Sequence, residues 1–463
     1  MAQPSGNSGI PQDKAGLWYR IQHRIPWYLL SVAAVFILAA LARFWAAPFS
    51  SGPDVVQFWA FAQTFDSHSL DFYQYAEATD GSFPYWGWAY VYPPLWILIL
   101  WLGSLATPEA FASTEFVSES WRLAVKTPII LADLAIGALI FWAVPGSKWK
   151  KLLFAGIWLL HPTGWYESAV FGQFDAIAAA FLLASVILFS RSNHKLGFLF
   201  AGLALVTKQH TLLPIVLVMI VVLRQLGMRK FTAYGMITAG VVILFSLPFV
   251  ATGNFGNYVD SVVTPGWDPD CQRPLCYAFS GSASLFTYLH DSRGWDTCGW
   301  LHYNTYVLAF GMLVALAITL RRKITIAQAA LVGMLLFIAI NYQINYQYLV
   351  IYIPLAVLVA AQATSRWQRA ATVGLVFMPA VWLWLYDVSF WFWSYRPQHP
   401  GVISYFDKIG WVNYLSSDWP YVVFAVSLTI ICVLYVSATF IFWTQENRVK
   451  YAPEATVSTG MLE

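Results

Sequence analysis

The chain has 463 residues, of which 59% are hydrophobic and only 11% are charged. This composition excludes an ordinary soluble globular protein, because such proteins contain about 25% charged residues. The formal net charge of +3 is close to balance and gives no indication of a nucleic-acid partner. Apolar runs of roughly 20 residues, the length that a bilayer requires of a helix, recur along the chain. The sequence therefore predicts an all-α polytopic membrane protein.

The first apolar run, 27–47, follows a polar tail that contains Lys14, Arg20 and Arg24. The run is longer than the hydrophobic core of a signal peptide, and no clear small-residue cleavage site follows it. We therefore expect it to be retained as the first transmembrane helix.

The orientation of the later spans follows from the basic residues, because loops rich in Lys and Arg stay in the cytoplasm. One assignment keeps the basic clusters on the cytoplasmic side throughout. These clusters are the N-terminal tail, Lys148 with Lys150 and Lys151, Arg191 with Lys195, Arg224 with Arg229 and Lys230, Arg321 to Lys323, Arg366 with Arg369, and Arg448 with Lys450.

This assignment requires the run 91–106 to be an interfacial or re-entrant helix, because a full span there would invert every later loop. Its opening residues, Tyr92, Pro93 and Pro94, suit a helix start. Several spans are shorter than a bilayer needs, so they should end at a cavity inside the protein. About twelve spans remain: 27–47, 121–143, 150–163, 171–190, 195–207, 210–224, 231–251, 304–320, 325–341, 346–362, 370–387 and 419–443.

The predicted organisation has two membrane modules joined by an external loop. The N-terminal catalytic module includes a long external loop, 48–120. In chain order the parts are a cytoplasmic tail (1–26), the N-terminal module (27–251), the external loop (252–303), a C-terminal transmembrane module (304–443) and a cytoplasmic tail (444–463).

Asp54 lies just beyond the first span, after Gly52 and Pro53. Its neighbours are apolar, and their desolvating effect would raise the pKa of the carboxyl group toward the range useful for a general base. Asp is also a favoured helix N-cap, so a capping role is the alternative.

The segment 161–175 joins two short spans and places Glu167, Gln173 and Asp175 at the outer mouth of the bundle. Ionisable groups at such a depth are candidates for a functional site. The alternative for Asp175 is that it caps the next helix.

A second polar segment, Thr207-Lys-Gln-His210, interrupts an apolar stretch. A lysine at this depth is costly unless it meets an anion or lines water. Lys208 could bind a ligand anion or pair with Glu167 or Asp175, and His210 is a second potential donor.

Arg122, Lys126 and Asp133 fall on one stripe of a predicted helix, since 100° per residue brings their positions together. This stripe should face the protein interior. We expect a structural role for Asp133, whereas Arg122 and Lys126 could hold a phosphate or reach toward the membrane surface.

The loop 252–303 contains Asp268 and Asp270 as an Asp-x-Asp pair, a candidate Mg²⁺ or Mn²⁺ site. Asp-Pro dipeptides are also common in turns. A disulfide in this loop would most simply join Cys271 to Cys276, while Cys432 is expected to be buried in the last span.

Several of these motifs, in this order, resemble the GT-C superfamily of membrane glycosyltransferases. The chain is most similar to the dolichyl-phosphate-glucose glucosyltransferases, and next to the polyprenyl-phosphate mannosyltransferases. One departure, apolar Val55, Val56 and Phe58 beside the acidic residue, leaves the sugar and the acceptor open. The motifs are Tyr85-Trp-Gly-Trp-Ala-Tyr-Val-Tyr-Pro-Pro-Leu95, the helix from Trp121 to Leu134, Gly172-Gln-Phe-Asp175, and Thr207-Lys-Gln-His210 ahead of Pro214.

The resemblance implies an inverting hexosyltransferase with an external active site, in which Asp54 is the base. The donor would be a polyprenyl-phosphate-linked glucose or mannose, and the acceptor a hydroxyl group, for example of a lipid-linked glycan. The expected phosphate-binding residues are Lys208, His210, Arg122 and Lys126, and the expected substrate-cavity residues are Gln57, Tyr92, Glu167, Gln173, Asp175 and Gln209.

The alternative function is a secondary transporter or flippase for a lipid or sugar, because such proteins also place ionisable residues in broken helices. A transporter would hold them near the membrane midplane, whereas this sequence places them at the outer mouths of the helices. Long external loops without an Asn-x-Ser/Thr site favour a prokaryotic cell membrane over the endoplasmic reticulum.

Overall fold

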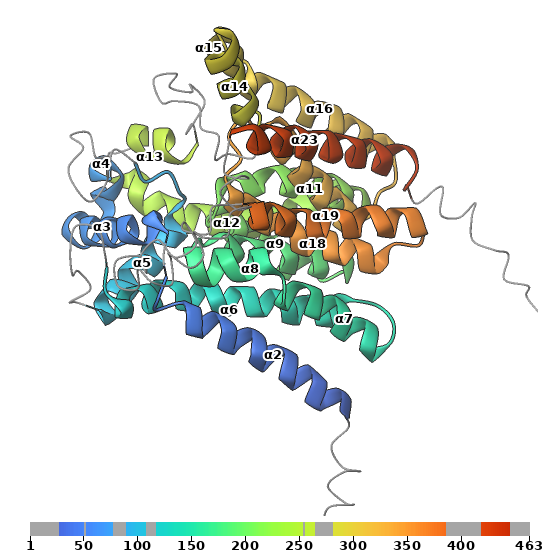
Figure 1. Ribbon diagram of the computed structural model, residues 1–463, viewed down its shortest axis with the longest axis horizontal. Helices are drawn as coiled ribbons and strands as arrows, with labels where there is room; N and C mark the ends of the chain where they lie inside the picture. Colours follow the sequence, from blue (N-terminus) through green and yellow to red (C-terminus); the bar gives the residue numbers. More distant parts are fainter. Residues whose placement is uncertain are drawn as a thin grey trace, which may run out of the picture.

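The structure is a computed structural model, which describes residues 27–50, 52–76, 89–107, 117–252, 255–263, 281–385 and 418–444. The regular elements of these ranges are helices, and most of the long ones lie side by side in one bundle (Figure 1). Six of the described helices are long and apolar enough to cross a membrane. The prediction of an all-α polytopic membrane protein is confirmed.

Each predicted span corresponds to a helix, with ends that differ by a few residues. These helices are α2 (Trp27–Ala46), α6 (Glu119–Ala143), α7 (Lys148–Leu159), α9 (Asp175–Ser190), α10 (His194–Leu205), α11 (Leu212–Leu226), α12 (Met228–Ala251), α16 (Asn304–Arg321), α17 (Ile326–Ile340), α18 (Leu349–Gln362), α19 (Arg366–Leu385) and α23 (Asp418–Ile441).

Shorter helices lie between the spans, most of them in the expected external segments. They are α3 (Pro53–His68), η1 (Ser69–Asp71), α4 (Phe72–Tyr75), α5 (Pro94–Ala106), α8 (Pro162–Trp165), η2 (Tyr166–Phe171), η3 (Gln209–Thr211), α13 (Phe255–Val262), α14 (Ala283–Arg293), α15 (Cys298–Leu301) and η4 (Tyr346–Tyr348).

The largest boundary errors concern the helices α7, α9 and α19, and the last of these begins at Arg366 instead of the predicted 370. The span predicted at 150–163 ends at Leu159, and the one predicted at 171–190 begins only at Asp175. Pro162 starts the separate helix α8, and the π-helical turn η2 follows it. Gly172, the residue after η2, has a left-handed backbone conformation. The break between the two spans is therefore an ordered turn with its own geometry.

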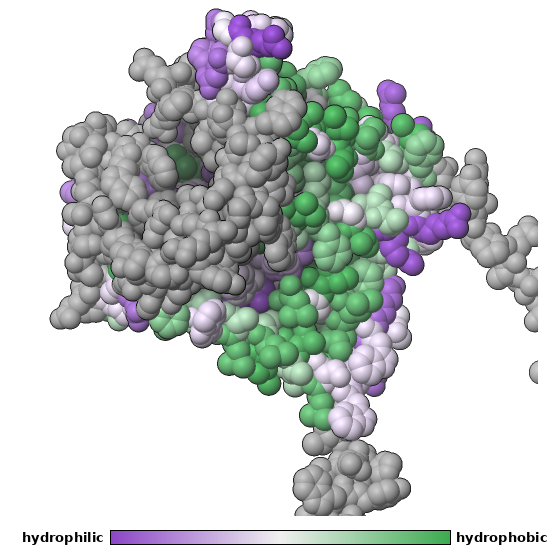
Figure 2. Space-filling model, viewed as in Figure 1, coloured by the Kyte–Doolittle hydropathy of each residue, from purple (hydrophilic) through white to green (hydrophobic). Residues whose placement is uncertain are grey.

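The centre of the bundle is formed by α9, α17 and α18, which contact one another. Most of their residues are buried, as expected for helices that are apolar on every face. The peripheral helices α2, α12 and α16 instead expose large apolar side chains, such as Leu38, Leu244 and Phe310. Figure 2 shows a hydrophobic flank on the bundle, which is suited to contact with lipid.

The basic interhelical loops gather at one end of the bundle. Arg224 donates hydrogen bonds from Nη1 to the carbonyl oxygens of Thr319 and Arg322, and Lys150 donates to that of Ala361. These bonds join the ends of α11 and α16, and of α7 and α18. The expectation that these basic clusters share one side of the protein is therefore met.

The opposite end of the bundle carries α3, α4, α5 and α13 (Figure 1). Helix α5 has 13 residues, about 20 Å at 1.5 Å per residue, which is shorter than a bilayer core of about 30 Å. It packs against α3 and α6, and its Leu95 N–H donates to the carbonyl oxygen of Val206. Its length agrees with the prediction that this segment does not span the membrane.

Candidate active site

Two glycines bring the start of α3 against the turn that precedes α9. The Gly52 N–H donates to the carbonyl oxygen of Phe171 at 2.8 Å. Gly172 has a φ of 89°, and a Cβ atom there would lie 2.6 Å from Val55 Cγ2 and 2.9 Å from Lys126 Cε. Only glycine tolerates both this conformation and this approach. The turn therefore fixes the residue that follows it, Gln173, beside α3.

Asp54 lies in the first turn of α3 and accepts a hydrogen bond from Gln173 Nε2. The N-cap of this helix is Gly52, with no side-chain cap, so the capping alternative for Asp54 is wrong. Burial raises the pKa of Asp54 to about 6, with the Lys208 ammonium acting to lower it and the Asp175 carboxylate to raise it. A carboxylate with this pKa can take up a proton near neutral pH.

Lys208 and Asp175 form a buried ion pair, with Nζ 2.7 Å from Oδ2. The Lys208 ammonium also lies over three aromatic rings, 4.3 Å from the centroid of Phe174, 4.9 Å from that of Tyr92 and 5.5 Å from that of Tyr348. The N-cap of α9 is Phe174, so Asp175 does not cap the helix. The alternative in which Asp175 pairs with Lys208 is confirmed.

His210 lies beside the same ion pair. Its Nε2 atom is 3.8 Å from Oδ1 of Asp175, and its ring stacks on Phe337 with a centroid distance of 5.3 Å and an interplanar angle of 6°. The ring of Tyr348 also lies against that of His210, with a distance of 4.6 Å between the ring centroids. The C-terminal part of the chain therefore contributes to the site through α17 and η4.

The remaining expected cavity residues surround this cluster. Glu167 interacts electrostatically with Asp54, Asp175 and Lys208. Gln209 donates from Nε2 to the carbonyl oxygen of Val91 at 2.8 Å, and this bond holds it beside the segment that carries Tyr92. Gln57 is buried in α3, about one turn after Asp54.

Several buried polar atoms of this cluster have no hydrogen-bond partner within the described part of the chain. An unsatisfied buried group of this kind costs about 1–3 kcal/mol, so several in one place indicate a site for a polar ligand. The atoms are Glu167 Oε2, Gln173 Oε1, Asp175 Oδ1, Gln209 Oε1 and His210 Nε2.

Lys126 and Arg122 are both buried, as the predicted stripe on α6 requires, but they differ in their contacts. Lys126 Nζ donates to the carbonyl oxygens of Ala47, Ser50, Ala169 and Val170, which occupy all three of its N–H groups. Arg122 has no partner for Nε or Nη1 among the described residues. Of these two cations, Arg122 alone has N–H groups available for a ligand.

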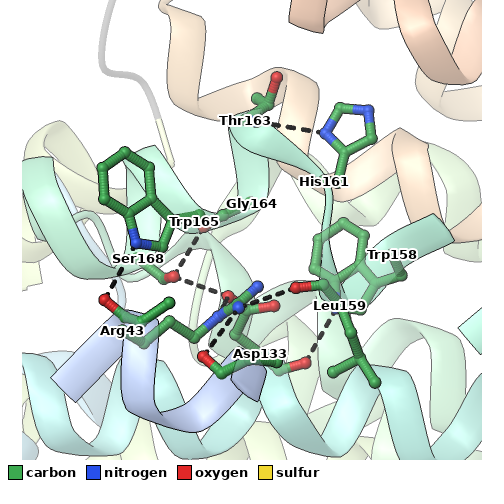
Figure 3. A network of polar contacts seen from close by, with 11 residues as sticks. Arg43, Asp133, Trp158, Leu159, His161, Thr163, Gly164, Trp165 and Ser168 are labelled. Carbon is green, nitrogen blue, oxygen red and sulfur yellow. Dashed lines mark hydrogen bonds and ion pairs between the residues drawn. The ribbon is translucent and has the colours of Figure 1, made fainter. Parts of the chain in front are cut away.

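A network behind the site ties the first span to the π-helical turn (Figure 3). Arg43 of α2 forms an ion pair with Asp133 of α6, with Nε 2.6 Å from Oδ2, and donates from Nη1 to the carbonyl oxygen of Leu159. Ser168 of η2 donates to the same Oδ2 atom at 2.6 Å and to the carbonyl oxygen of Gly164. The structural role expected for Asp133 is confirmed.

Sequence analysis did not identify Arg43, Phe174, Phe337 or Tyr348 as parts of this region. For Arg43 a signal existed, since an arginine inside an apolar span needs a partner. Nothing in the sequence distinguished the three aromatic residues from the many others in the chain. Asp268, Asp270, Cys271 and Cys276 lie outside the described residues, and the described ranges contain no group of three or more side chains that could hold a metal ion. Cys432 is buried in α23, as expected.

Comparison with known proteins identifies a glycosyltransferase family and a similar solved structure. The model of glycosyltransferase family 87 matches residues 90–341, more than half of the chain. No curated protein matches. The chain is similar to the crystal structure of ArnT from Cupriavidus metallidurans bound to undecaprenyl phosphate, with 15% sequence identity and a TM-score of 0.45, over 90% of this chain and 77% of that chain.

Proposed function

The chain belongs to glycosyltransferase family 87, and on that premise we propose that it transfers a hexose from a polyprenyl-phosphate-linked donor to an acceptor hydroxyl group. The observation that carries the proposal is the proximity of Asp54 to the buried Lys208–Asp175 pair. Asp54 has a pKa of about 6 and interacts electrostatically with both residues. A base and a cation are thus available in one polar cluster.

In the proposed reaction Asp54 is the general base. The acceptor oxygen forms a bond to the anomeric carbon while its proton passes to the Asp54 carboxylate. The bond between the anomeric carbon and the phosphate oxygen breaks, and its electron pair leaves with the polyprenyl phosphate. Attack from the face opposite to the leaving group inverts the configuration of the anomeric carbon. Gln173 orients Asp54 through the hydrogen bond to Oδ2.

The departing phosphate needs positive charge or hydrogen-bond donors rather than a general acid, because it is a good leaving group. We assign this role to Lys208, His210 and Arg122. Lys208 is held by Asp175 and three aromatic rings, and Arg122 has buried N–H groups without a partner in the described ranges. Lys126 is assigned a structural role instead, because four carbonyl oxygens surround it.

The position of the charged residues favours transfer over the alternative of transport. Asp54 lies in the first turn of α3, Asp175 is the first residue of α9, and Lys208 directly precedes η3. These helix ends lie away from the basic loops, whereas a transporter would carry such charges in mid-membrane. With the basic loops in the cytoplasm, the proposed site faces the external side of the membrane.

The proposal also includes the identities of the donor and the acceptor that the motif resemblance implies. The donor is a polyprenyl-phosphate glucose or mannose, and the acceptor is a lipid-linked glycan in a prokaryotic cell membrane. Asp268 and Asp270 are retained as a candidate Mg²⁺ or Mn²⁺ site.

The test is a transfer assay with the purified protein in liposomes. Radiolabelled polyprenyl-phosphate glucose and polyprenyl-phosphate mannose are supplied separately with a lipid-linked glycan acceptor, each with and without a chelator. We expect one donor to be consumed and the product to have the inverted anomeric configuration. Consumption of neither donor, or retention of configuration, would overturn the proposal.

A further inference from the structure

Glu167 lies in the π-helical turn η2, where hydrogen bonds to its own backbone and hydrogen bonds of the next residue hold it in place. Its carbonyl oxygen accepts hydrogen bonds from the N–H groups of Gly172 and Gln173, at 2.9 and 2.8 Å. The next residue, Ser168, is bonded through Oγ to Asp133 and to the carbonyl oxygen of Gly164. Single π-helical turns inside helical proteins are frequent at functional sites. The same turn thus positions Glu167 and the residue that orients Asp54.

The side chain of Glu167 is 2% exposed, and its Oε2 atom has no hydrogen-bond partner within the described ranges. It forms no ion pair with another described residue. The charged groups that face it are Asp54 on α3, Asp175 on α9 and Lys208 before η3. Lys208 is already paired with Asp175 at 2.7 Å, so an ionised Glu167 would leave two carboxylates in excess over the single cation.

The surroundings therefore favour the neutral form of Glu167. Burial, then the Asp175 and Asp54 carboxylates, raise its pKa well above the ordinary value, against a smaller opposing effect of Lys208. A neutral carboxyl group has one O–H donor and a carbonyl acceptor. A sugar hydroxyl group also both donates and accepts, so the two groups are complementary.

We propose that Glu167 is a substrate-binding residue that recognises a hydroxyl group of the transferred sugar through hydrogen bonds made by a neutral carboxyl group. The inference rests on the proposed hexosyl transfer and deepens it, because it names a residue that selects the sugar. Glu167 is suited to this role because the anion-binding groups, Lys208 and His210, lie next to Asp175, whereas Glu167 has no cation of its own.

The protonation state is tested by infrared difference spectroscopy of the reconstituted protein at neutral pH. The unmodified protein should show the carbonyl band of a protonated carboxylic acid. In Glu167→Gln this band should be weaker, because the contribution of Glu167 is absent. Asp260→Asn, which changes an exposed carboxylate on α13, is the matched control and should leave the band unchanged. An unchanged intensity of the band in Glu167→Gln would overturn the neutral state.

The binding role is tested with polyprenyl-phosphate hexoses that lack one hydroxyl group at a time. Glu167→Gln keeps a donor and an acceptor, and we expect it to raise the KM for the donor less than Glu167→Leu does. Glu167→Leu removes both, and we expect the KM for the donor to rise about tenfold, as for the loss of one or two hydrogen bonds. The unmodified protein should discriminate against one deoxy donor, and Glu167→Leu should lose that discrimination.

The outcomes separate this inference from the proposed function. Absence of transfer by the unmodified protein contradicts the proposed function itself. Transfer by the unmodified protein together with an unchanged donor KM and unchanged discrimination in Glu167→Leu overturns the inference alone. Loss of transfer in Glu167→Gln as severe as in Asp54→Asn would overturn it too, because Glu167 would then act as an ionised group. Thermal unfolding of each variant identifies those that fail to fold.

Discussion

Gln173 donates a side-chain hydrogen bond to the carboxylate of Asp54, although 119 positions separate the two residues in the chain. The bond fixes one oxygen of the proposed base, Oδ2. It exists because Gly172, in a left-handed conformation, turns the chain toward α3.

Replacing Gln173 should lower the rate of transfer more than the stability. Gln173→Ala removes the donor that orients Asp54, and we expect kcat to fall at least tenfold with a small change in donor KM. Gln173→Glu places a carboxyl group against Asp54 and should also raise the pKa of the base. Steady-state kinetics in liposomes measure both effects. An unchanged kcat in Gln173→Ala would show that the hydrogen bond does not serve catalysis.

Activity should depend on the ionisation of Asp54. The base is active when deprotonated and its pKa is about 6, so kcat/KM should be constant above this pH and fall about tenfold per unit below it. Asp175→Asn removes a nearby negative charge and should move the inflection to lower pH. An inflection near pH 4 in the unmodified protein would contradict the assigned environment of Asp54.

The Lys208–Asp175 pair should contribute both to the stability of the protein and to transfer, and the two contributions can be measured separately. Lys208→Met leaves Asp175 buried without its cation, which should cost about 3–5 kcal/mol of stability and abolish transfer. The double variant Lys208→Met, Asp175→Leu removes both charges and should recover much of the Tm, but not the activity. Thermal unfolding and the transfer assay check this. Recovery of transfer in the double variant would mean that Lys208 does not act on the donor.

Gly172→Ala should disturb both the fold and the site. The φ of 89° and the approach of Val55 Cγ2 to 2.6 Å of a Cβ atom both oppose the substitution. The matched control is Gly227→Ala, where φ is 71° but nothing lies within 4 Å of a Cβ atom. We expect a modest loss of Tm in the control with normal transfer, and a larger loss of Tm with impaired transfer in Gly172→Ala. Equal effects would show that the close approach is unimportant.

The sequence was sufficient to predict the helices because lipid imposes both their length and their composition. The position of the basic clusters was enough to exclude 91–106 as a span. The helix ends near Pro162 and Asp175 differ from the prediction, because a π-helical turn has no distinctive pattern in a single sequence. The sequence placed Asp54, Asp175 and Lys208 on the same outer face, and in the structure the three groups interact electrostatically.

Apart from the Lys208–Asp175 pair, the partners within the site could not be predicted, because they depend on packing between distant segments. Arg43 and Asp133 are 90 positions apart, and nothing in either segment identifies the other. Lys126 and Arg122 lie on the same stripe of α6, yet only the structure distinguishes the cation enclosed by carbonyl oxygens from the one with available N–H groups. Tyr348 reaches Lys208 from the C-terminal part of the chain.

The central claim is that Asp54 is the base of a polyprenyl-phosphate-dependent hexosyl transfer. The most direct measurement is kcat for Asp54→Asn in liposomes, with whichever of the two labelled donors the unmodified protein consumes. The substitution keeps the size of the side chain and removes its basicity, so we expect kcat to fall by at least about 100-fold while Tm stays near that of the unmodified protein. Full transfer by a folded Asp54→Asn variant would contradict the claim.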